Sequence, residues 1–297
     1  MNKIKNPKIL VPIDFSEVSL SALKHAGHIA QTLKGEIVLL NVQKRKELSD
    51  IIFPAIKMGS MDMVTGYVSE KLEEIAKKAR EDFGIKVTTI VSEGNISSEI
   101  VNVAEENKAG LIVMGTQGND STHDKILGSN SYKVLTKSSI PVITTLNGVE
   151  KTTFKKILMP IDTSKHSREK AHTAIYLAEK FGAELHVLGL LGLKEADYEY
   201  KMEIILGQII ELAKKKNVTC VTSIQTSSNR VETTLDHGKK INAGLIVIMT
   251  DQHTEFSHAI LGTYAHQLIN ESDIPVLCIH PEYHPENIPM SAPGGLW

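Results

Sequence analysis

A heptapeptide occurs twice in this chain with a single difference, as KILVPID at residues 8–14 and as KILMPID at residues 156–162. The relation returns near the end of each half, where AGLIV stands at 109–113 and again at 243–247. Self-similarity of this kind indicates a tandem duplication rather than a chance match. We therefore expect two copies of one domain, of which the second is shorter in its middle.

The two copies divide the chain into units of ordinary domain size, about 150 residues each. We expect the first domain at 1–148 and the second at 155–281, with the joint near residues 147–155. The tail 282–297 is rich in proline and glycine and has no periodicity, so we assign it no secondary structure. Residues 43–60 also fall outside the repeat and predict a surface excursion.

Apolar strand-like stretches alternate with helix-like stretches in both halves. In the first half the expected strands are 8–13, 36–42, 86–91, 110–114 and 141–146, and the expected helices are 19–33, 61–82, 97–107 and 128–137. In the second half the expected strands are 156–161, 184–190, 218–223, 244–249 and 275–280. Continuous apolar strands separated by helices indicate a parallel sheet that is covered on both faces. The predicted fold is α/β, with two tandem doubly wound parallel five-stranded sheets.

The composition excludes several classes of protein. A formal net charge of −2 gives no reason to expect affinity for nucleic acid or acidic membranes, and no apolar run approaches the roughly 18–20 residues of a membrane span. The N-terminal residues lead directly into a strand, without the apolar core and cleavage site of an export signal. The only two cysteines, Cys220 and Cys278, lie in apolar segments. We expect buried reduced thiols and a cytoplasmic protein.

A glycine pattern follows the expected strand LIVMG, with Gly115, Gly118 and Gly128-Ser129 leading into a helix that also carries Ser131. Gly115 would free the strand end to turn, and Gly118 would keep a Cβ away from a bound phosphate. The helix start and the two serine hydroxyls would supply hydrogen-bond donors to an anion. A glycine-rich turn before a serine-capped helix explains the same residues without a ligand. The spacing fits neither a Walker loop nor a GxGxxG fingerprint.

Together with KILVPID at the start of the chain, this pattern resembles the universal stress protein family, and the resemblance covers essentially the whole chain, taken twice. It implies the adenine-nucleotide α-hydrolase-like fold with strand order 3-2-1-4-5. It also implies ATP, with or without magnesium, at the carboxyl ends of strands one and four. The implied phosphate contacts are Gly118, Gly128, Ser129, Asn130 and Ser131; the implied ribose contacts are Asp14 and Gly115; and the main chain of Val42 would meet the adenine, with Pro12 and Ile13 lining its pocket.

Asp14 has a second interpretation, because an aspartate between a strand and Ser16 often forms the turn or cap that starts a helix. Both roles are compatible with its repetition as Asp162.

The second half departs from the pattern. Met249 and Gln252 stand where the first half has Gly115 and Gly118, although Gly262-Thr263 keep the helix start, and Gly189-Leu190 replace Asn41-Val42. Side chains at the two former glycines would crowd a triphosphate. We therefore predict that the second half binds ATP much more weakly or not at all.

Other polar residues suggest no further site. His253 and His258 match no standard metal spacing, so we expect exposed loop histidines and no metal site. Lys125 could neutralise a γ-phosphate, but a lone lysine in a polar loop is more often solvated. No catalytic motif occurs, although slow ATP hydrolysis stays open.

The main functional hypothesis is an ATP-binding stress-response protein that acts through nucleotide-dependent conformation or partner binding. The alternatives are a weak ATPase or nucleotidyl-transferring enzyme, and a scaffold that binds no nucleotide. In single-domain members of the family, the last strands pair across a two-fold axis. We therefore expect an internal pseudo-dimer joined through residues 141–146 and 275–280, which would remove two exposed strand edges, and we keep a further homodimer as an option.

Overall fold

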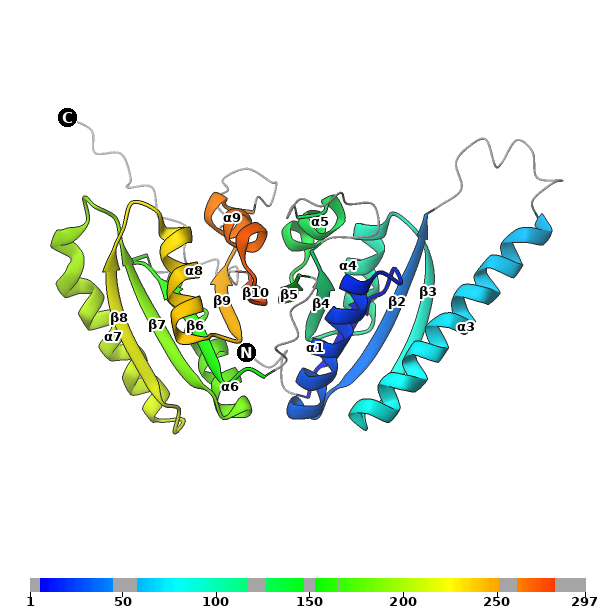
Figure 1. The fold of residues 1–297 in the computed structure, drawn as a ribbon, viewed down its shortest axis with the longest axis horizontal. Helices are drawn as coiled ribbons and strands as arrows, with labels where there is room; N and C mark the ends of the chain where they lie inside the picture. The colour runs from blue at the N-terminus through cyan, green and yellow to red at the C-terminus, as the bar shows by residue number, and fades with distance from the viewer. Residues whose placement is uncertain are drawn as a thin grey trace, which may run out of the picture.

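The computed structural model describes residues 6–44, 58–116, 127–146, 153–164, 166–250 and 261–280. Its strands form one continuous ten-stranded sheet that runs across the molecule (Figure 1), in the order β3-β2-β1-β4-β5-β10-β9-β6-β7-β8. Each half contributes five strands in the order 3-2-1-4-5, which confirms the predicted topology. The two predicted sheets are therefore two halves of one larger sheet.

The first half follows the predicted alternation closely. Its described elements are β1 (Lys8–Pro12), α1 (Glu17–Leu33), β2 (Glu36–Lys44), α3 (Met58–Phe83), β3 (Val87–Gly94), α4 (Ile96–Glu106), β4 (Leu111–Gly115), α5 (Ser129–Lys137) and β5 (Val142–Thr145). Local signals set their ends. For example, α1 begins where the Ser16 hydroxyl accepts a hydrogen bond from the Ser19 N–H, and it ends where Lys34 adopts a left-handed conformation.

The second half repeats this arrangement with a different start to its first helix. Its described elements are β6 (Lys156–Ile161), η2 (His166–Arg168), α6 (Ala171–Phe181), β7 (Glu184–Leu191), η3 (Ala196–Tyr198), α7 (Glu199–Lys214), β8 (Cys220–Thr226), α8 (Arg230–Ile241), β9 (Leu245–Met249), α9 (Thr263–Glu271) and β10 (Val276–Ile279). A short 3-10 turn, η2, therefore takes the place of the first turns of helix α1.

Side chains of each strand alternate between two apolar cores, one on each face of the sheet. Ile9 and Val11 of β1 lie in the first core, whereas Leu10 lies in the second. Helices α1, α3, α6 and α7 cover the first face, and α4, α5, α8 and α9 cover the second. Burial on both faces explains why the strands read as continuous apolar runs rather than as alternating ones.

The two halves meet edge to edge at β5 and β10, which pair antiparallel at the centre of the sheet (Figure 1). The register places Val276 opposite Thr144, Leu277 opposite Ile143, and Cys278 opposite Val142. This pairing confirms the predicted joint through residues 141–146 and 275–280. It also removes two strand edges that would otherwise be open to another chain.

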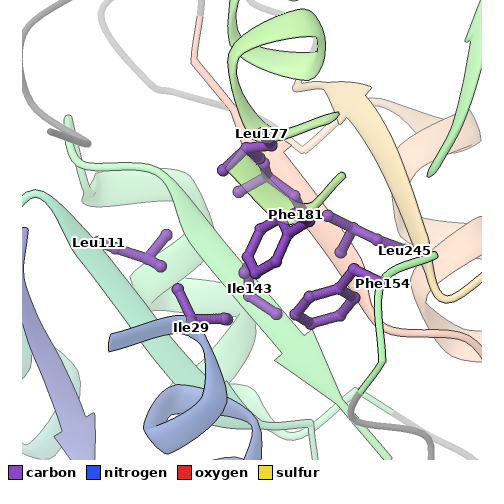
Figure 2. Close-up of a pocket in the computed structure, with 8 residues that line it drawn as sticks. Ile29, Leu111, Ile143, Phe154, Leu177, Phe181 and Leu245 are labelled. Carbon is purple, nitrogen blue, oxygen red and sulfur yellow. The ribbon is translucent and has the colours of Figure 1, made fainter. Parts of the chain in front are cut away.

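A small cavity lies at this joint, and Figure 2 shows that hydrocarbon side chains from both halves line it. Its lining consists of Ile29, Leu111, Ile143, Phe154, Leu177, Phe181, Leu245 and Leu277. Leu111 and Leu245 are the first residues of β4 and β9, so the cavity lies at the amino ends of these strands. The Phe154 and Phe181 rings meet edge to face with their centroids 4.9 Å apart. With no polar group in its lining, the cavity belongs to the packing of the joint.

Several residues singled out from the sequence lie outside the described ranges. They are Gly118, Lys125, Gln252, His253 and His258, with most of 43–60 and the tail 282–297. Among the helices that are described, none is both long enough and apolar enough to cross a lipid bilayer.

Candidate functional site

The carboxyl ends of β1 and β4 lie side by side, because these two strands are parallel neighbours with Ile9 opposite Leu111. The chain leaves β1 toward α1 on one face of the sheet, and it leaves β4 toward α5 on the other. Strands whose connections diverge in this way mark the switch point at which open α/β sheets hold ligands. Asp14 follows β1 and Gly115 ends β4, so both predicted residues lie at this switch point.

Asp14 is exposed and shapes the turn into α1. One of its carboxylate oxygens, Oδ1, accepts hydrogen bonds from the main-chain N–H (3.0 Å) and the hydroxyl of Ser16. Ser16 is itself the N-cap of the helix. The turn-forming interpretation of Asp14 is therefore correct, and the cap is the neighbouring serine. Since the turn uses Oδ1, the second carboxylate oxygen is the one that could meet a ribose hydroxyl.

The main chain of Val42 faces the same crevice. The ladder between β1 and β2 ends with the Ile13 N–H donating to the Leu40 carbonyl at 2.7 Å, whereas β2 continues beside β3 as far as Lys44. Main-chain groups of a strand point to the same side at every second residue, so those of Val42 point past the end of β1. The Asn41 amide donates to the Ile13 carbonyl at 2.7 Å and ties the two strand ends together.

Two predicted lining residues sit below this point. Pro12 is half-buried at the end of β1, and the Ile13 side chain is 2% exposed within the first core. In sequence they join the end of β1 to Asp14.

Gly115 has a packing reason to be glycine. A Cβ at this position would lie 2.5 Å from Cγ1 of Val18 and 3.4 Å from its main-chain carbonyl carbon, because the first turn of α1 packs against the strand end. Gly115 is a strand residue and does not need the left-handed conformation. Packing against Val18, rather than a special backbone angle, therefore accounts for a glycine at this position.

Helix α5 begins without a side-chain cap. Gly128 is the N-cap, with φ −59° and ψ 147°, and the first helical bond runs from the Tyr132 N–H to the Gly128 carbonyl at 2.9 Å. The N–H groups of 129–131 precede that bond and have no acceptor within the helix. In contrast, α1 and α4 begin with Ser16 and Asn95, whose side chains accept from the first turn. The open start of α5 offers three donors and the positive end of a helix dipole to an anion.

Two hydrogen bonds hold this open turn against the end of β4. The Gly128 N–H donates to the Thr116 carbonyl at 2.7 Å, and the Ser131 hydroxyl donates to the Gly115 carbonyl at 3.0 Å. Ser131 is 5% exposed, so the phosphate contact expected of this residue falls to its main-chain N–H. Ser129 is exposed and Asn130 is half-buried in the same turn.

At the corresponding strand ends of the second half, the structure places an arginine and a glutamate that have no counterpart among the described residues of the first half. Arg230 follows the N-cap Asn229 of α8 as Ile96 follows the N-cap Asn95 of α4. Its guanidinium donates to the Glu195 carboxylate at 2.7 Å and lies 3.9 Å from that of Asp162, the counterpart of Asp14.

These charges affect the ionisation of Asp162. Burial alone would raise its pKa, but hydrogen bonds from Ser164 and the positive charges of Lys170 and Arg230 together hold the pKa below its ordinary value. The carboxylate that would meet a ribose in this half is therefore already paired with the protein's own cations.

Tyr264 also changes this crevice, since it holds the position of Asn130. Its hydroxyl lies 2.9 Å from Oγ1 of Thr234 on α8 and within electrostatic range of Asp162 and Arg230, and burial raises its pKa. Met249, in the position of Gly115, is 8% exposed and excludes the close approach that Val18 makes in the first half.

Sequence reasoning missed Arg230, Glu195 and Tyr264. The sequence indicated two of them, because Arg230 and Tyr264 differ in chemistry from Ile96 and Asn130, their counterparts in the repeat.

The described residues contain no activated thiol and no metal cluster. Burial raises the pKa of Cys220 to about 11 and raises that of the fully buried Cys278 further. Both thiols are free in the structure; Cys278 is buried as predicted, whereas Cys220 is only half-buried. In the described part of the chain, no three His, Cys, Asp or Glu side chains gather closely enough to hold a metal ion.

Comparison with known proteins gives a consistent result for both halves. The model of the universal stress protein family matches residues 5–145 and again residues 153–280. Universal stress protein MJ0531 of Methanocaldococcus jannaschii is 36% identical over 140 residues, which cover 46% of this chain and 79% of that protein. Universal stress protein MJ0577 of the same organism is 33% identical over 149 residues, which cover 46% of this chain and 92% of that protein.

A solved structure extends the likeness to the whole chain. The crystal structure of a universal stress protein from Archaeoglobus fulgidus has a TM-score of 0.76 and 26% identity, and the match covers 94% of this chain and 99% of that one. Two matches to one family model, together with two sheets of order 3-2-1-4-5 joined through their last strands, lead to one conclusion. The chain belongs to the universal stress protein family, as a tandem two-domain member.

Proposed function

We propose that the first half binds one adenine nucleotide, ATP, and that the protein acts in a stress response through nucleotide-dependent conformation or partner binding. The observation that carries this proposal is the open N-terminus of α5, which lies at the same strand ends as Asp14 and the Val42 main chain. These groups match the three parts of a nucleotide, because they supply donors for phosphate, a carboxylate for ribose hydroxyls, and main-chain groups for a base edge.

The proposed contacts follow from this arrangement. The N–H groups of 129–131, with the Ser129 hydroxyl, meet the phosphates. The free oxygen of Asp14 accepts from the ribose, and Val42 meets the adenine above Pro12 and Ile13. Gly118 completes the phosphate turn in the family pattern, and a magnesium ion would be held by the phosphates.

We further propose that the second half binds no ATP, for a reason beyond the loss of two glycines. The Arg230–Glu195 pair reaches Asp162, and the Tyr264 ring extends from α9 to Thr234 on α8. A nucleotide would have to displace an ion pair as well as a buried phenol. Displacing Arg230 would leave the Glu195 and Asp162 carboxylates without their cation beside an anionic triphosphate, so these residues disfavour the exchange.

Isothermal titration of the full chain with ATP tests both proposals. We expect one ATP per chain, and native mass spectrometry should detect ATP that copurifies. A stoichiometry of two would overturn the proposal for the second half, and no binding would overturn the proposal for the first. Release of phosphate over many turnovers would replace the binding role with an ATPase.

A homodimer of the whole chain, which the sequence leaves open, would need a surface other than the last strands. Strands β5 and β10 already pair with each other inside the chain. Light scattering across a range of protein concentrations, with and without ATP, measures whether such a dimer forms.

A further inference from the structure

A hydrogen bond crosses between the two halves immediately before the open start of α5. The main-chain N–H of Leu127, the residue before the N-cap of α5, donates to Oδ1 of Asn270 at 2.7 Å. Leu127 belongs to the first half and is 6% exposed, whereas Asn270 lies on α9 of the second half. A buried N–H without an acceptor costs free energy, so the amide of Asn270 holds the chain at this point.

This bond breaks the symmetry between the two halves. Leu261-Gly262 correspond to Leu127-Gly128, and Thr136 corresponds to Asn270, since each lies two residues before the serine that ends its helix. The Thr136 hydroxyl donates to the Lys133 carbonyl of its own helix at 3.1 Å. Among the described residues, only the first half therefore has its phosphate turn held by the opposite half.

The bond from Asn270 completes a set that orients the open turn. Two bonds already anchor the turn to β4, through Gly128 and Ser131. Nearby, the Tyr132 and His266 rings, which are counterparts in the repeat, meet across the joint with their centroids 5.7 Å apart. The segment that presents three N–H groups to an anion is thus held from the β4 side by its own half and from the α9 side by the other.

We propose that Asn270 is a positioning residue for the nucleotide site of the first half, so that the second half supports ATP binding without binding ATP itself. The inference rests on the proposed ATP site. Fixing Leu127 before the ligand arrives keeps the donors of 129–131 aimed at one point, and preorganised donors lose less freedom on binding. The effect concerns the phosphates, because Asp14 follows β1 and Val42 lies on β2, whereas this bond holds the residue before the N-cap of α5.

The test compares Asn270→Ala with the wild-type full chain, by isothermal titration with ATP and separately with adenosine. We expect the variant to bind ATP about fivefold to tenfold more weakly, as for the loss of one hydrogen bond, and to bind adenosine as the wild type does. Thr136→Ala, the matched change in the first half, should leave both affinities unchanged. Asn270→Ser, too short to reach Leu127, should repeat the loss with less disturbance to folding.

Two outcomes would overturn the inference alone. One is ATP affinity in both Asn270 variants equal to that of a wild type that binds ATP, and the other is an equal loss for ATP and adenosine. A wild-type chain that binds neither ligand would instead overturn the proposed function, and the inference with it.

Discussion

Gly115 belongs both to a packing contact and to the glycine pattern of the proposed nucleotide site. In sequence it belongs to a glycine pattern that suggests a ligand, yet its hydrogen atom also faces Val18 of α1. The two roles separate in the second half. There, Met249 replaces the glycine, and the helix that follows β6 starts only at Ala171, after the turn η2. The half that has the glycine is therefore the half in which the helix starts soon after the first strand, at Glu17.

We predict that Gly115→Ala destabilises the protein by about 1–3 kcal/mol, the usual cost of overpacking. The added Cβ would lie 2.5 Å from Val18 Cγ1, and Val18 is too short to swing away. Urea unfolding measures the loss. Adding Val18→Ala should restore part of it, because the double variant removes the clash. Wild-type stability in the single variant would contradict the packing explanation.

His280 predicts a dependence of stability on pH. Its Nδ1 lies 2.9 Å from the Thr250 hydroxyl, and its buried Nε2 has no hydrogen-bond partner among the described residues. Burial lowers its pKa from the ordinary 6.5 to about 4, against a smaller opposing effect of the Leu135 main chain. As pH falls below 6.5, the unfolded chain takes up this proton before the folded chain does, so stability falls between pH 6.5 and 4.

The contribution of His280 should be isolated by His280→Asn, which keeps a polar group near Thr250 but does not titrate. The difference in unfolding free energy between variant and wild type should be constant above pH 6.5. It should then move by up to about 3 kcal/mol in favour of the variant by pH 4. Parallel stability curves for the two proteins over that range would refute this assignment.

At the scale of elements, α5 and α9 form a natural comparison. Both begin at a glycine with no side-chain cap, at Gly128 and Gly262, with nearly the same backbone conformation. They differ in what faces the open turn. Asp14 and the Val42 main chain share the crevice of α5, whereas Tyr264 and the Arg230 pair occupy the crevice of α9. The two open helix starts therefore differ in their neighbours, and the proposed nucleotide site is the one at α5.

We predict opposite effects of Gly128→Asp on stability and on ATP binding. The carboxylate would cap the free N–H groups and favour the helix dipole, so the ligand-free protein should gain a few tenths of a kcal/mol. The same carboxylate would occupy the phosphate position, so ATP affinity should fall at least about tenfold. Thermal unfolding and calorimetry measure the two effects. Gly262→Asp is the matched control, expected to affect stability alike and ATP binding not at all.

At the scale of the whole molecule, the duplication produces one sheet rather than two linked ones. Strands β5 and β10 pair across the joint, and the apolar cavity beneath them is lined from both sides (Figure 2). Phe154, from the segment that enters β6, is 3% exposed and packs on Phe181. Burial of this ring is a major apolar contribution to the joint.

We predict that Phe154→Ala lowers the free energy of unfolding by about 3–5 kcal/mol, because it enlarges an existing cavity and removes the contact with Phe181. Tyr200→Ala is the control, since Tyr200 is 75% exposed on α7 and should change stability by less than about 0.5 kcal/mol. Urea titration followed by circular dichroism measures both. A loss at Phe154 no larger than that at Tyr200 would show that the cavity wall carries little of the joint's stability.

The repeat and the periodicity were sufficient to predict two α/β units with parallel strands, because each follows from local patterns that recur in both halves, whereas the strand order came from the family resemblance. Continuous apolar strands such as Leu111–Met114 require burial on both faces, and only a parallel sheet between helix layers provides it. The pairing of β5 with β10 was also accessible, through the family resemblance and the need to cover exposed edges. For the candidate site, the sequence pattern was enough to place Asp14 and Gly115 at strand ends and Gly128 at a helix start.

The contacts between elements required the tertiary structure, because they join residues whose separation in sequence carries no signal. The approach of Val18 to Gly115, the reach of Arg230 to Asp162 and the bond from Leu127 to Asn270 each link different elements. A side-chain contact depends on how two elements pack, and no periodicity within one element encodes that. Sequence thus predicts where a nucleotide would lie, while the packing of Arg230, Glu195 and Tyr264 decides what occupies the matching position of the second half.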